Sequence, residues 1–286
     1  MNPNYSKNSV LKLNDYSVSG EAFQLYKNLE FGFLETHPKP NQDKLPDYYK
    51  SENYISHTDT KRNVFEKLYH TVRAFALNRK IRLISKYTSP EKNLLDIGCG
   101  TGDFLKTAQQ HNWGILGIEP NAQARTIANT KTKNAVFAPD KLLTLKPSTF
   151  DVITLWHVLE HLPDLENQIE IYKALLKPNG TLIVAVPNYK SYDAQFYKQH
   201  WAAYDVPRHL WHFNRKSVSA LFSKYHLKVT KTKPMWFDAF YVSLLSEQYK
   251  SGKMNYVKAF IIGMLSNLKA VGTKEASSLI YVIKNI

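Results

Sequence analysis

An aspartate, three glycines and a later glutamate have the types and spacing of a nucleotide-binding turn. The stretch LLDIGCGTGDFL (94–105) carries Asp96 two residues before a G-x-G-x-G run, and Glu119 follows Gly98 by 21 residues. Glycine permits positive φ and lets a ligand touch the backbone, and a helix that follows directs its free N–H groups at that ligand. A carboxylate there favours an ammonium or sulfonium ligand over a pyrophosphate. The spacing also disfavours a dehydrogenase, whose dinucleotide site reads G-x-G-x-x-G.

A group of histidines with one glutamate is the second feature that could do chemistry. His157, Glu160 and His161 have the i, i+3, i+4 spacing that puts side chains on one face of a helical turn, and His209 and His212 follow in DVPRHLWHF. Such residues can supply a general base, bind a divalent metal or stabilise a turn, and the sequence leaves all three open. We favour the base, with His209 as first choice and His157 as second.

Alternating strand and helix patterns from Asn93 onward would position both groups. Strand-like stretches such as NLLDIG, GILGIEP, FDVITLWH and GTLIVAVPN are separated by helical stretches of 10–15 residues. This alternation predicts right-handed βαβ units and a parallel sheet, whose strand ends form the ligand-binding edge. A helical insertion at about 238–272 and a last strand in SSLIYVIKN are expected to complete the chain.

The first 60 residues are expected to form an N-terminal appendage, and residues 61–286 the ligand-binding domain. FQLYKNLEFGFLE predicts a small hairpin, and 61–87 show helical periodicity. Tyr49, Tyr54 and His57 lie just before that helix. We expect their segment either to cover the ligand as a lid that excludes water or to pack as a surface arm.

Composition bounds the class of protein. The 286 residues are 43% hydrophobic and 22% charged, with one cysteine, so a soluble protein of a reducing compartment is expected, and we predict a cytoplasmic one. No apolar stretch approaches the roughly 20 residues that span a bilayer. The net charge of +14 permits nucleic acid, anionic lipid or an acidic small molecule as partner, but the scattered lysines favour an ordinary solvated surface.

Four motifs in order, LLDIGCGTGDFL, LGIEPNA, FDVITLWHVLEHLPD and LLKPNGTLIVAVPN, resemble those of class I S-adenosylmethionine-dependent methyltransferases. The similarity covers roughly residues 90–235 and is greatest to the group that includes ubiquinone-pathway O-methyltransferases. It implies an α/β fold with a doubly wound, mostly parallel, seven-stranded Rossmann-like sheet. The cofactor it implies is S-adenosylmethionine.

The resemblance also implies residue roles. Gly98 and Gly100 would contact the methionine part of the cofactor near Asp96, Glu119 would hold the ribose hydroxyls, and Asp140 would lie near the adenine. The full set of implied cofactor residues is Asp96, Gly98, Cys99, Gly100, Gly102, Glu119, Pro120, Asp140, Trp156 and His157.

Two departures concern metals. Some members of this group carry a cysteine-bearing, zinc-ribbon-like segment near the N-terminus, but residues 11–37 contain no cysteine, so we expect no zinc there. Similar methyltransferases have a Glu-x-x-Glu-His run where this chain has His157, Glu160 and His161. A divalent metal on these three residues, with His209 as an optional fourth ligand, is therefore an alternative that we do not favour.

The loop DVPRHLWHF is the expected acceptor-binding segment. Asp205, Arg208, Trp211 and His212 offer aromatic and charged groups that suit a flat or acidic substrate, although they could also pack or pair with each other. We expect a small-molecule or glycan-like acceptor. RNA or protein methylation, or a methyltransferase-like protein that only binds its ligand, are the alternatives, and the oligomeric state is left open.

A helix with an apolar stripe is expected at 255–271. Val257, Phe260, Ile261, Met264, Leu265 and Leu268 follow the i, i+3, i+4 pattern. The stripe suits either an anionic membrane or a core helix that packs beside the active-site rim or against a second copy of the chain. We favour the packed helix, because only two lysines border the stripe.

Overall fold

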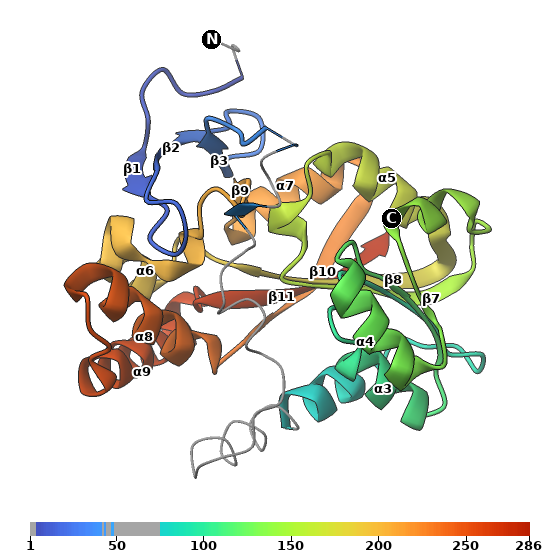
Figure 1. Cartoon of the computed structure of the whole chain (residues 1–286). Coiled ribbons are helices and arrows are strands. Elements are labelled where there is room, and N and C mark those ends of the chain that lie inside the picture. Colours follow the sequence, from blue (N-terminus) through green and yellow to red (C-terminus); the bar gives the residue numbers. More distant parts are fainter. Residues whose placement is uncertain (1–3, 42, 44–46, 49–74) are drawn as a thin grey trace.

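The computed structural model describes residues 4–41, 43, 47–48 and 75–286 (Figure 1). The expected lid residues Tyr49, Tyr54 and His57 lie outside the described residues, as do the expected domain boundary at 60 and the first part of the helix expected from residue 61. Residues 75–84 of that helix are helical.

A seven-stranded sheet with the order β10-β11-β8-β7-β4-β5-β6 forms the centre of the protein. β4, β5, β6, β7 and β8 run parallel, whereas β11 lies antiparallel to both β8 and β10. The strands are β4 (Asn93–Ile97), β5 (Gly114–Ile118), β6 (Val136–Phe137), β7 (Phe150–Trp156), β8 (Leu176–Pro187), β10 (Leu227–Pro234) and β11 (Ser278–Asn285). The predicted doubly wound, mostly parallel α/β sheet of seven strands is confirmed.

Helices cover both faces of this sheet. Figure 1 shows α5 and α7 on one face and α3 and α4 on the other. The helices are α3 (Asp103–Gln110), α4 (Ala122–Thr132), α5 (Leu165–Leu175), α6 (Tyr192–Tyr197), α7 (Arg215–Lys224), α8 (Asp238–Ser251) and α9 (Tyr256–Thr273), with short 3-10 turns η2 (Pro139–Thr144), η3 (Leu159–His161), η4 (Lys198–His200) and η5 (Ala202–Tyr204).

Side chains that alternate along each central strand pack on the two opposite faces of the sheet. Leu94 of β4 and Val152 of β7 pack with α3 and the helical residues at 75–84, whereas the neighbouring Leu95 and Ile153 pack with α5 and α7. Successive side chains of a strand point to opposite faces, so a strand covered by helices on both sides must be apolar throughout. This is why the central strands read as continuous apolar runs in the sequence.

A second sheet combines three N-terminal strands with one strand from the loop that follows β8. β1 (Leu11–Asn14), β2 (Ala22–Lys27), β3 (Leu34–His37) and β9 (Trp211–His212) form it in that order, and all its pairs are antiparallel. The hairpin expected from FQLYKNLEFGFLE is β2–β3. Its pairing with β9 was not predicted, and it ties the N-terminal strands to the loop that carries the histidines.

In the chain, α8 and α9 connect β10 to β11. The two helices form a packed pair at one end of the molecule (Figure 1). The expectation that the α9 stripe packs beside the active-site rim of its own chain is wrong, because its side chains are between 36% and 71% exposed, whereas packing against a second copy stays a prediction. The opposite face of α9 is buried through Ala259, Ile262, Gly263, Ser266 and Ala270. Small side chains allow α9 to lie closely against α8: a Cβ added at Gly263 would stand 2.8 Å from Cδ1 of Phe240.

Candidate active site

The glycine turn lies between β4 and α3 and holds an open space at its centre. Gly98, Gly100 and Gly102 have φ of 64°, 55° and 78°, in the region that favours glycine. A Cβ added at Gly98 would stand 2.5 Å from Cγ2 of Val158, whereas a Cβ at Gly100 would meet nothing within 4 Å. The protein itself therefore requires a glycine at 98, and the free space at 100 leaves room for a ligand against the backbone.

Glu119 lies at the end of β5 and faces the same turn. Its Oε2 accepts a hydrogen bond from the backbone N–H of Gly100 at 2.8 Å, and Oε1 accepts one from the N–H of Asn121 at 2.9 Å. Burial raises the pKa of Glu119, while these bonds and the charge of Arg125 oppose that rise. Each carboxylate oxygen has a second lone pair, so Glu119 retains the capacity to accept two hydroxyl donors.

Asp96 is buried beneath the turn. Only 2% of it is exposed, and its Oδ1 accepts a hydrogen bond from the hydroxyl of Thr154 at 2.6 Å. Burial raises the pKa of Asp96 to about 7, although Thr154 and the charge of Lys80 counteract this. A cationic ligand group beside Asp96 would stabilise its charged form, which suits the ammonium of an amino acid.

Lys80 is a member of this site that the sequence did not reveal. Its Nζ lies 4.2 Å from the ring centroid of Trp156 and 5.8 Å from that of Phe104. Burial lowers the pKa of Lys80, and the charges of Asp96 and Asp238 partly restore it. A lysine within a helical stretch gives no signal in the sequence that it faces the sheet edge.

His157 follows β7 with a φ of 58°, and its ring lies between two carboxylates. Its Nδ1 lies 3.3 Å from Glu160 Oε1, and its Nε2 lies 3.1 Å from Asp238 Oδ2. Burial disfavours the charged ring, but the contacts with Asp238 and Glu160 prevail and raise the pKa of His157 to about 10. A histidine that holds its proton at neutral pH cannot take another, so the predicted role of His157 as a base does not fit. Asp238, on the distant α8, is a further partner that the sequence did not reveal.

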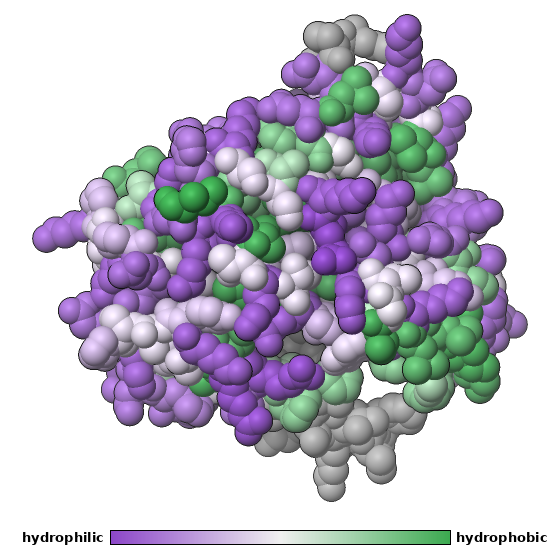
Figure 2. Space-filling model, turned by 180° about the vertical axis from the view of Figure 1, so that it is seen from behind, coloured by the Kyte–Doolittle hydropathy of each residue, from purple (hydrophilic) through white to green (hydrophobic). Residues whose placement is uncertain are grey.

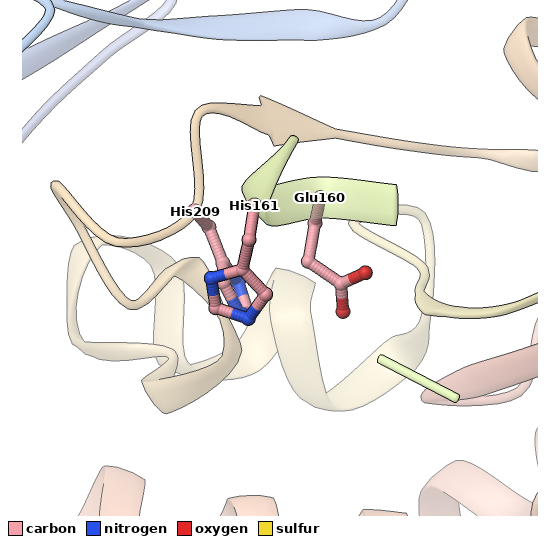
Figure 3. Close-up of side chains that lie close together, drawn as sticks. All are labelled: Glu160, His161 and His209. Carbon is pink, nitrogen blue, oxygen red and sulfur yellow. The ribbon is translucent and has the colours of Figure 1, made fainter. Parts of the chain in front are cut away.

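Glu160, His161 and His209 form a buried cluster (Figure 3). His161 Nδ1 lies 3.0 Å from the carbonyl oxygen of Arg208, and His209 Nδ1 lies 2.9 Å from that of Ala203. Because a carbonyl only accepts, each Nδ1 carries a proton and donates it, while Nε2 of His209 lies 3.9 Å from Asp205 Oδ2. The two rings meet edge to face with centroids 4.5 Å apart.

The same cluster has the composition of a divalent-metal site. One ligand atom from each of its three residues lies within 4.8 Å of the others. Glu160 is only 1% exposed; its Oε1 pairs with Nδ1 of His157 at 3.3 Å, whereas its Oε2 accepts no hydrogen bond from a residue that the structure describes. Histidines that donate Nδ1–H to backbone carbonyls are typical of metal ligands. The alternative metal set of the sequence is thereby changed: Glu160, His161 and the optional ligand His209 lie together, while His157 pairs with Asp238 and lies outside the group.

The four residues expected to bind the acceptor have structural partners instead. Arg208 donates to Asp205 and to the carbonyl of Tyr48, and pairs with Asp15 of the N-terminal region at 3.3 Å. Arg208 and Asp15 are buried, and the cluster links the loop to the N-terminal sheet, so Arg208 is not free to hold a substrate.

The two remaining acceptor candidates are likewise buried. Trp211 donates its Nε1–H to the carbonyl of Leu162 at 2.7 Å, and Nε2 of His212 lies 2.9 Å from Oγ1 of Thr36. Burial lowers the pKa of His212, as does the neighbouring His209. The expected roles of Asp205, Arg208, Trp211 and His212 in substrate binding are therefore not supported, and these residues position His209 within its loop.

The other implied cofactor residues lie around the same edge. Asp140 is exposed in η2 after β6, and Pro120 is exposed after β5. Cys99 is partly buried within the turn, and burial raises the pKa of its thiol. Trp156 is half-buried against Phe104. The structure thus brings these residues to the carboxyl ends of β4, β5, β6 and β7, where a parallel sheet binds its ligand.

A cavity of about 430 Å³ adjoins this edge between the helical residues 75–84 and the connection from β10 to α8. Lys80 and Asp238 line it and also face the site described above. Its other lining residues combine cations with apolar and aromatic groups, namely Arg79, Arg82, Lys86, Lys233, Met235, Trp236, Phe237 and Ile280. A larger cavity of about 630 Å³ lies against the N-terminal sheet near Tyr26 and Glu35, away from the glycine turn.

The sequence of this chain matches known proteins over its central part. A family model described as a methyltransferase domain matches residues 68–232. Ubiquinone biosynthesis O-methyltransferase from Histophilus somni is 32% identical over 109 residues, which are 34% of this chain and 46% of that protein. The corresponding protein from Coxiella burnetii is 29% identical over 109 residues, 35% of this chain and 47% of its own. The match therefore spans about half the length of these relatives.

Solved structures share the architecture at low identity. A SAM-dependent methyltransferase from Archaeoglobus fulgidus covers 78% of this chain and 100% of its own, with a TM-score of 0.52 and 16% identity. Magnesium protoporphyrin IX methyltransferase from Synechocystis, solved with bound SAH, covers 86% of this chain and 100% of its own, with a TM-score of 0.56 and 13% identity. At such identities the likeness concerns the fold.

Proposed function

The chain belongs to the S-adenosylmethionine-dependent methyltransferases, and we propose that it transfers a methyl group to an oxygen of a small-molecule or glycan-like acceptor. The match to ubiquinone biosynthesis O-methyltransferases supports oxygen as the methylated atom. S-adenosylmethionine supplies an electrophilic methyl group on a sulfonium. What remains for the protein is to hold the acceptor in line, exclude water and remove the hydroxyl proton.

The residues around the glycine turn fit this cofactor. The open space at Gly100 admits it against the backbone, the buried carboxylate of Asp96 suits its ammonium, and Glu119 can accept its ribose hydroxyls. The carboxylate beside the turn and the glycine spacing both disfavour a dinucleotide.

We expect Glu119→Ala to weaken S-adenosylmethionine binding by about 1.5–3 kcal/mol, the scale of hydrogen bonds to a charged group. Glu119→Gln keeps one acceptor oxygen, so its affinity for S-adenosylmethionine should lie between those of the wild type and Glu119→Ala. Calorimetric titration with S-adenosylmethionine measures the effect, and NADH serves as the competing ligand. Glu170→Ala, at an exposed position of α5, is the matched control. An unchanged dissociation constant in folded Glu119→Ala would contradict this assignment.

The main support for methylation of an oxygen is the pair of histidines His161 and His209, half-buried and buried, whose Nδ1 atoms are bound to backbone carbonyls. This arrangement orients the rings, and it supports our proposal that Nε2 of His209 takes the hydroxyl proton. The cavity beside Lys80 and Asp238 supports a flat, acidic acceptor, because its lining offers cations and two aromatic rings.

A metal-assisted form of the same reaction is the second candidate. The buried Oε2 of Glu160, which accepts no hydrogen bond within the described part of the chain, favours it. Glu160, His161 and His209 would then hold a divalent cation that lowers the pKa of the acceptor hydroxyl.

We expect His209→Ala to lower the turnover of methyl transfer by roughly 10²–10⁴-fold and to leave S-adenosylmethionine affinity unchanged, because His209 acts on the acceptor proton. The assay follows labelled methyl transfer to extracts separated into small molecules, glycans, lipids, proteins and RNA. His111→Ala, at the exposed end of α3, is the control.

Two comparisons distinguish the alternatives: the effect of EDTA separates the base from the metal role, and the labelled extract fraction identifies the class of acceptor. Activity that EDTA abolishes and Mg²⁺ restores assigns the metal role, and activity indifferent to EDTA assigns the base. Label found only in RNA or protein would contradict a small-molecule acceptor. A His209→Ala protein with full turnover would exclude both roles of the cluster.

A further inference from the structure

One face of α9 is apolar and exposed to solvent. It is formed by Val257, Phe260, Ile261, Met264, Leu265 and Leu268, which are between 36% and 71% exposed and are called the α9 apolar face below. Figure 2 shows apolar surface gathered along the edge of the molecule that α8 and α9 form. A contiguous exposed apolar surface of this kind marks an interaction site in a soluble domain.

The orientation of α9 is fixed, so the face cannot turn inward. Ser266, on the opposite side of the helix, donates its hydroxyl to Asp193 Oδ1 at 2.6 Å. Gly263 lies directly against Phe240 of α8, and Ala259 and Ala270 are buried beside it. Burial of these small residues leaves the large ones on the outer side.

The charged residues of α9 and of the segments next to it, between Glu247 and Glu275, are all lysines. Residues 248–274 contain five lysines and no aspartate or glutamate. Lys258 reaches back to Glu247 at 3.0 Å, and Lys269 lies 3.8 Å from the ring centroid of Tyr192, so both line the border of the face with the rest of the protein. Two copies of the chain joined through this face would bring ten lysines together, whereas an anionic surface complements them.

The helix has the dimensions of one that lies on a bilayer. Its 18 residues extend about 27 Å. Among the described residues, no helix has the length and hydropathy needed to cross a bilayer. An amphipathic helix with lysines and large apolar side chains lies in the interface plane and buries its apolar side among the lipid headgroups.

We propose that α9 docks the protein on an anionic lipid bilayer through the α9 apolar face. The apolar side chains enter the interface, and Lys250, Lys253 and Lys274 contact the anionic headgroups. This docking does not depend on the identity of the methyl acceptor.

Flotation of the full chain with vesicles tests the proposal. The protein is expected to float with phosphatidylglycerol–phosphatidylcholine vesicles, to remain below with pure phosphatidylcholine, and to be released in part by 0.5 M NaCl, about threefold the physiological ionic strength. Phe260→Glu and Leu268→Glu should each reduce the bound fraction at limiting lipid by roughly tenfold or more, since each removes a buried apolar group and introduces a charge. Lys253→Glu should weaken binding to anionic vesicles less.

Leu143→Glu is the matched control, because Leu143 is 80% exposed on η2 and lies outside the α9 apolar face. Circular dichroism checks that each variant is folded. The proposal is overturned if the wild-type chain fails to float with anionic vesicles, or if Leu143→Glu reduces flotation as much as Phe260→Glu. It is also overturned if light scattering finds a dimer that Phe260→Glu dissociates while flotation is unchanged.

Discussion

Gly98→Ala is expected to unfold more easily and to lose S-adenosylmethionine binding. Alanine at a φ of 64° adopts a left-handed conformation, and its Cβ would stand 2.5 Å from Cγ2 of Val158. The conformational strain and the overpacking together cost roughly 2–5 kcal/mol of unfolding free energy. Val158 follows His157 directly, so any relief of the clash must also move the residues that border the cofactor. Thermal unfolding and calorimetric titration measure the two effects.

Gly100→Ala distinguishes the effect of the turn on stability from its effect on cofactor binding. Its φ of 55° is similar, but the added Cβ would meet nothing within 4 Å. We expect a loss of only about 1 kcal/mol in stability, together with a clear loss of S-adenosylmethionine affinity, because the methyl group enters the space assigned to the cofactor. If Gly100→Ala binds the cofactor as tightly as the wild type, the cofactor does not approach the backbone there. If Gly98→Ala is as stable as the wild type, the close contact with Val158 does not constrain the turn.

Features that depend on local sequence were predictable. The glycine turn, the position of Glu119 and the central strands follow from patterns within about ten residues, since periodicity and glycine conformation act locally. The parallel sheet follows from the alternation of strands and helices. The appendage and domain boundaries stay predictions, because residue 60 lies outside the described residues.

Features that depend on distant partners were not predictable. The pairing of His157 with Asp238 joins β7 to α8, and it changes a proposed base into a cation. Arg208 meets Asp15 from nearly two hundred residues earlier in the chain. Neither contact has a local signal, because an ion pair requires only that the fold bring opposite charges together.

The orientation of α9 was the other error, and it has a physical reason. Hydrophobic periodicity identifies an amphipathic helix but does not state which side faces the protein. Here close helix packing through Ala259, Gly263 and Ser266 determined the buried side. Small residues at every third or fourth position can therefore outweigh a stripe of larger apolar side chains.

We expect Asp96→Asn to make stability less dependent on pH and to weaken S-adenosylmethionine binding. Burial raises the pKa of Asp96 to about 7, compared with about 3.9 in an unfolded chain. The folded state therefore holds this proton more tightly, and the wild type loses stability as the pH rises from about 4 to 7. Asparagine resembles the neutral acid and carries no such penalty. The variant should match the wild type near pH 4 and exceed it by at most about 4 kcal/mol at pH 8.

Asp151→Asn provides a control for which the expected change in stability at high pH has the opposite sign. Asp151 is also buried, but it accepts from the N–H of Asn93 and from Lys177, and these contacts outweigh burial and lower its pKa. Its carboxylate stabilises the fold above the unfolded pKa, and that contribution is lost as the pH falls, so Asp151→Asn should be less stable than the wild type at pH 8. Urea unfolding at pH 4.5 and pH 8 measures both variants. A difference between Asp96→Asn and the wild type that is the same at both pH values would contradict the raised pKa. Unchanged S-adenosylmethionine affinity in Asp96→Asn would show that the carboxylate does not face the ammonium of the cofactor.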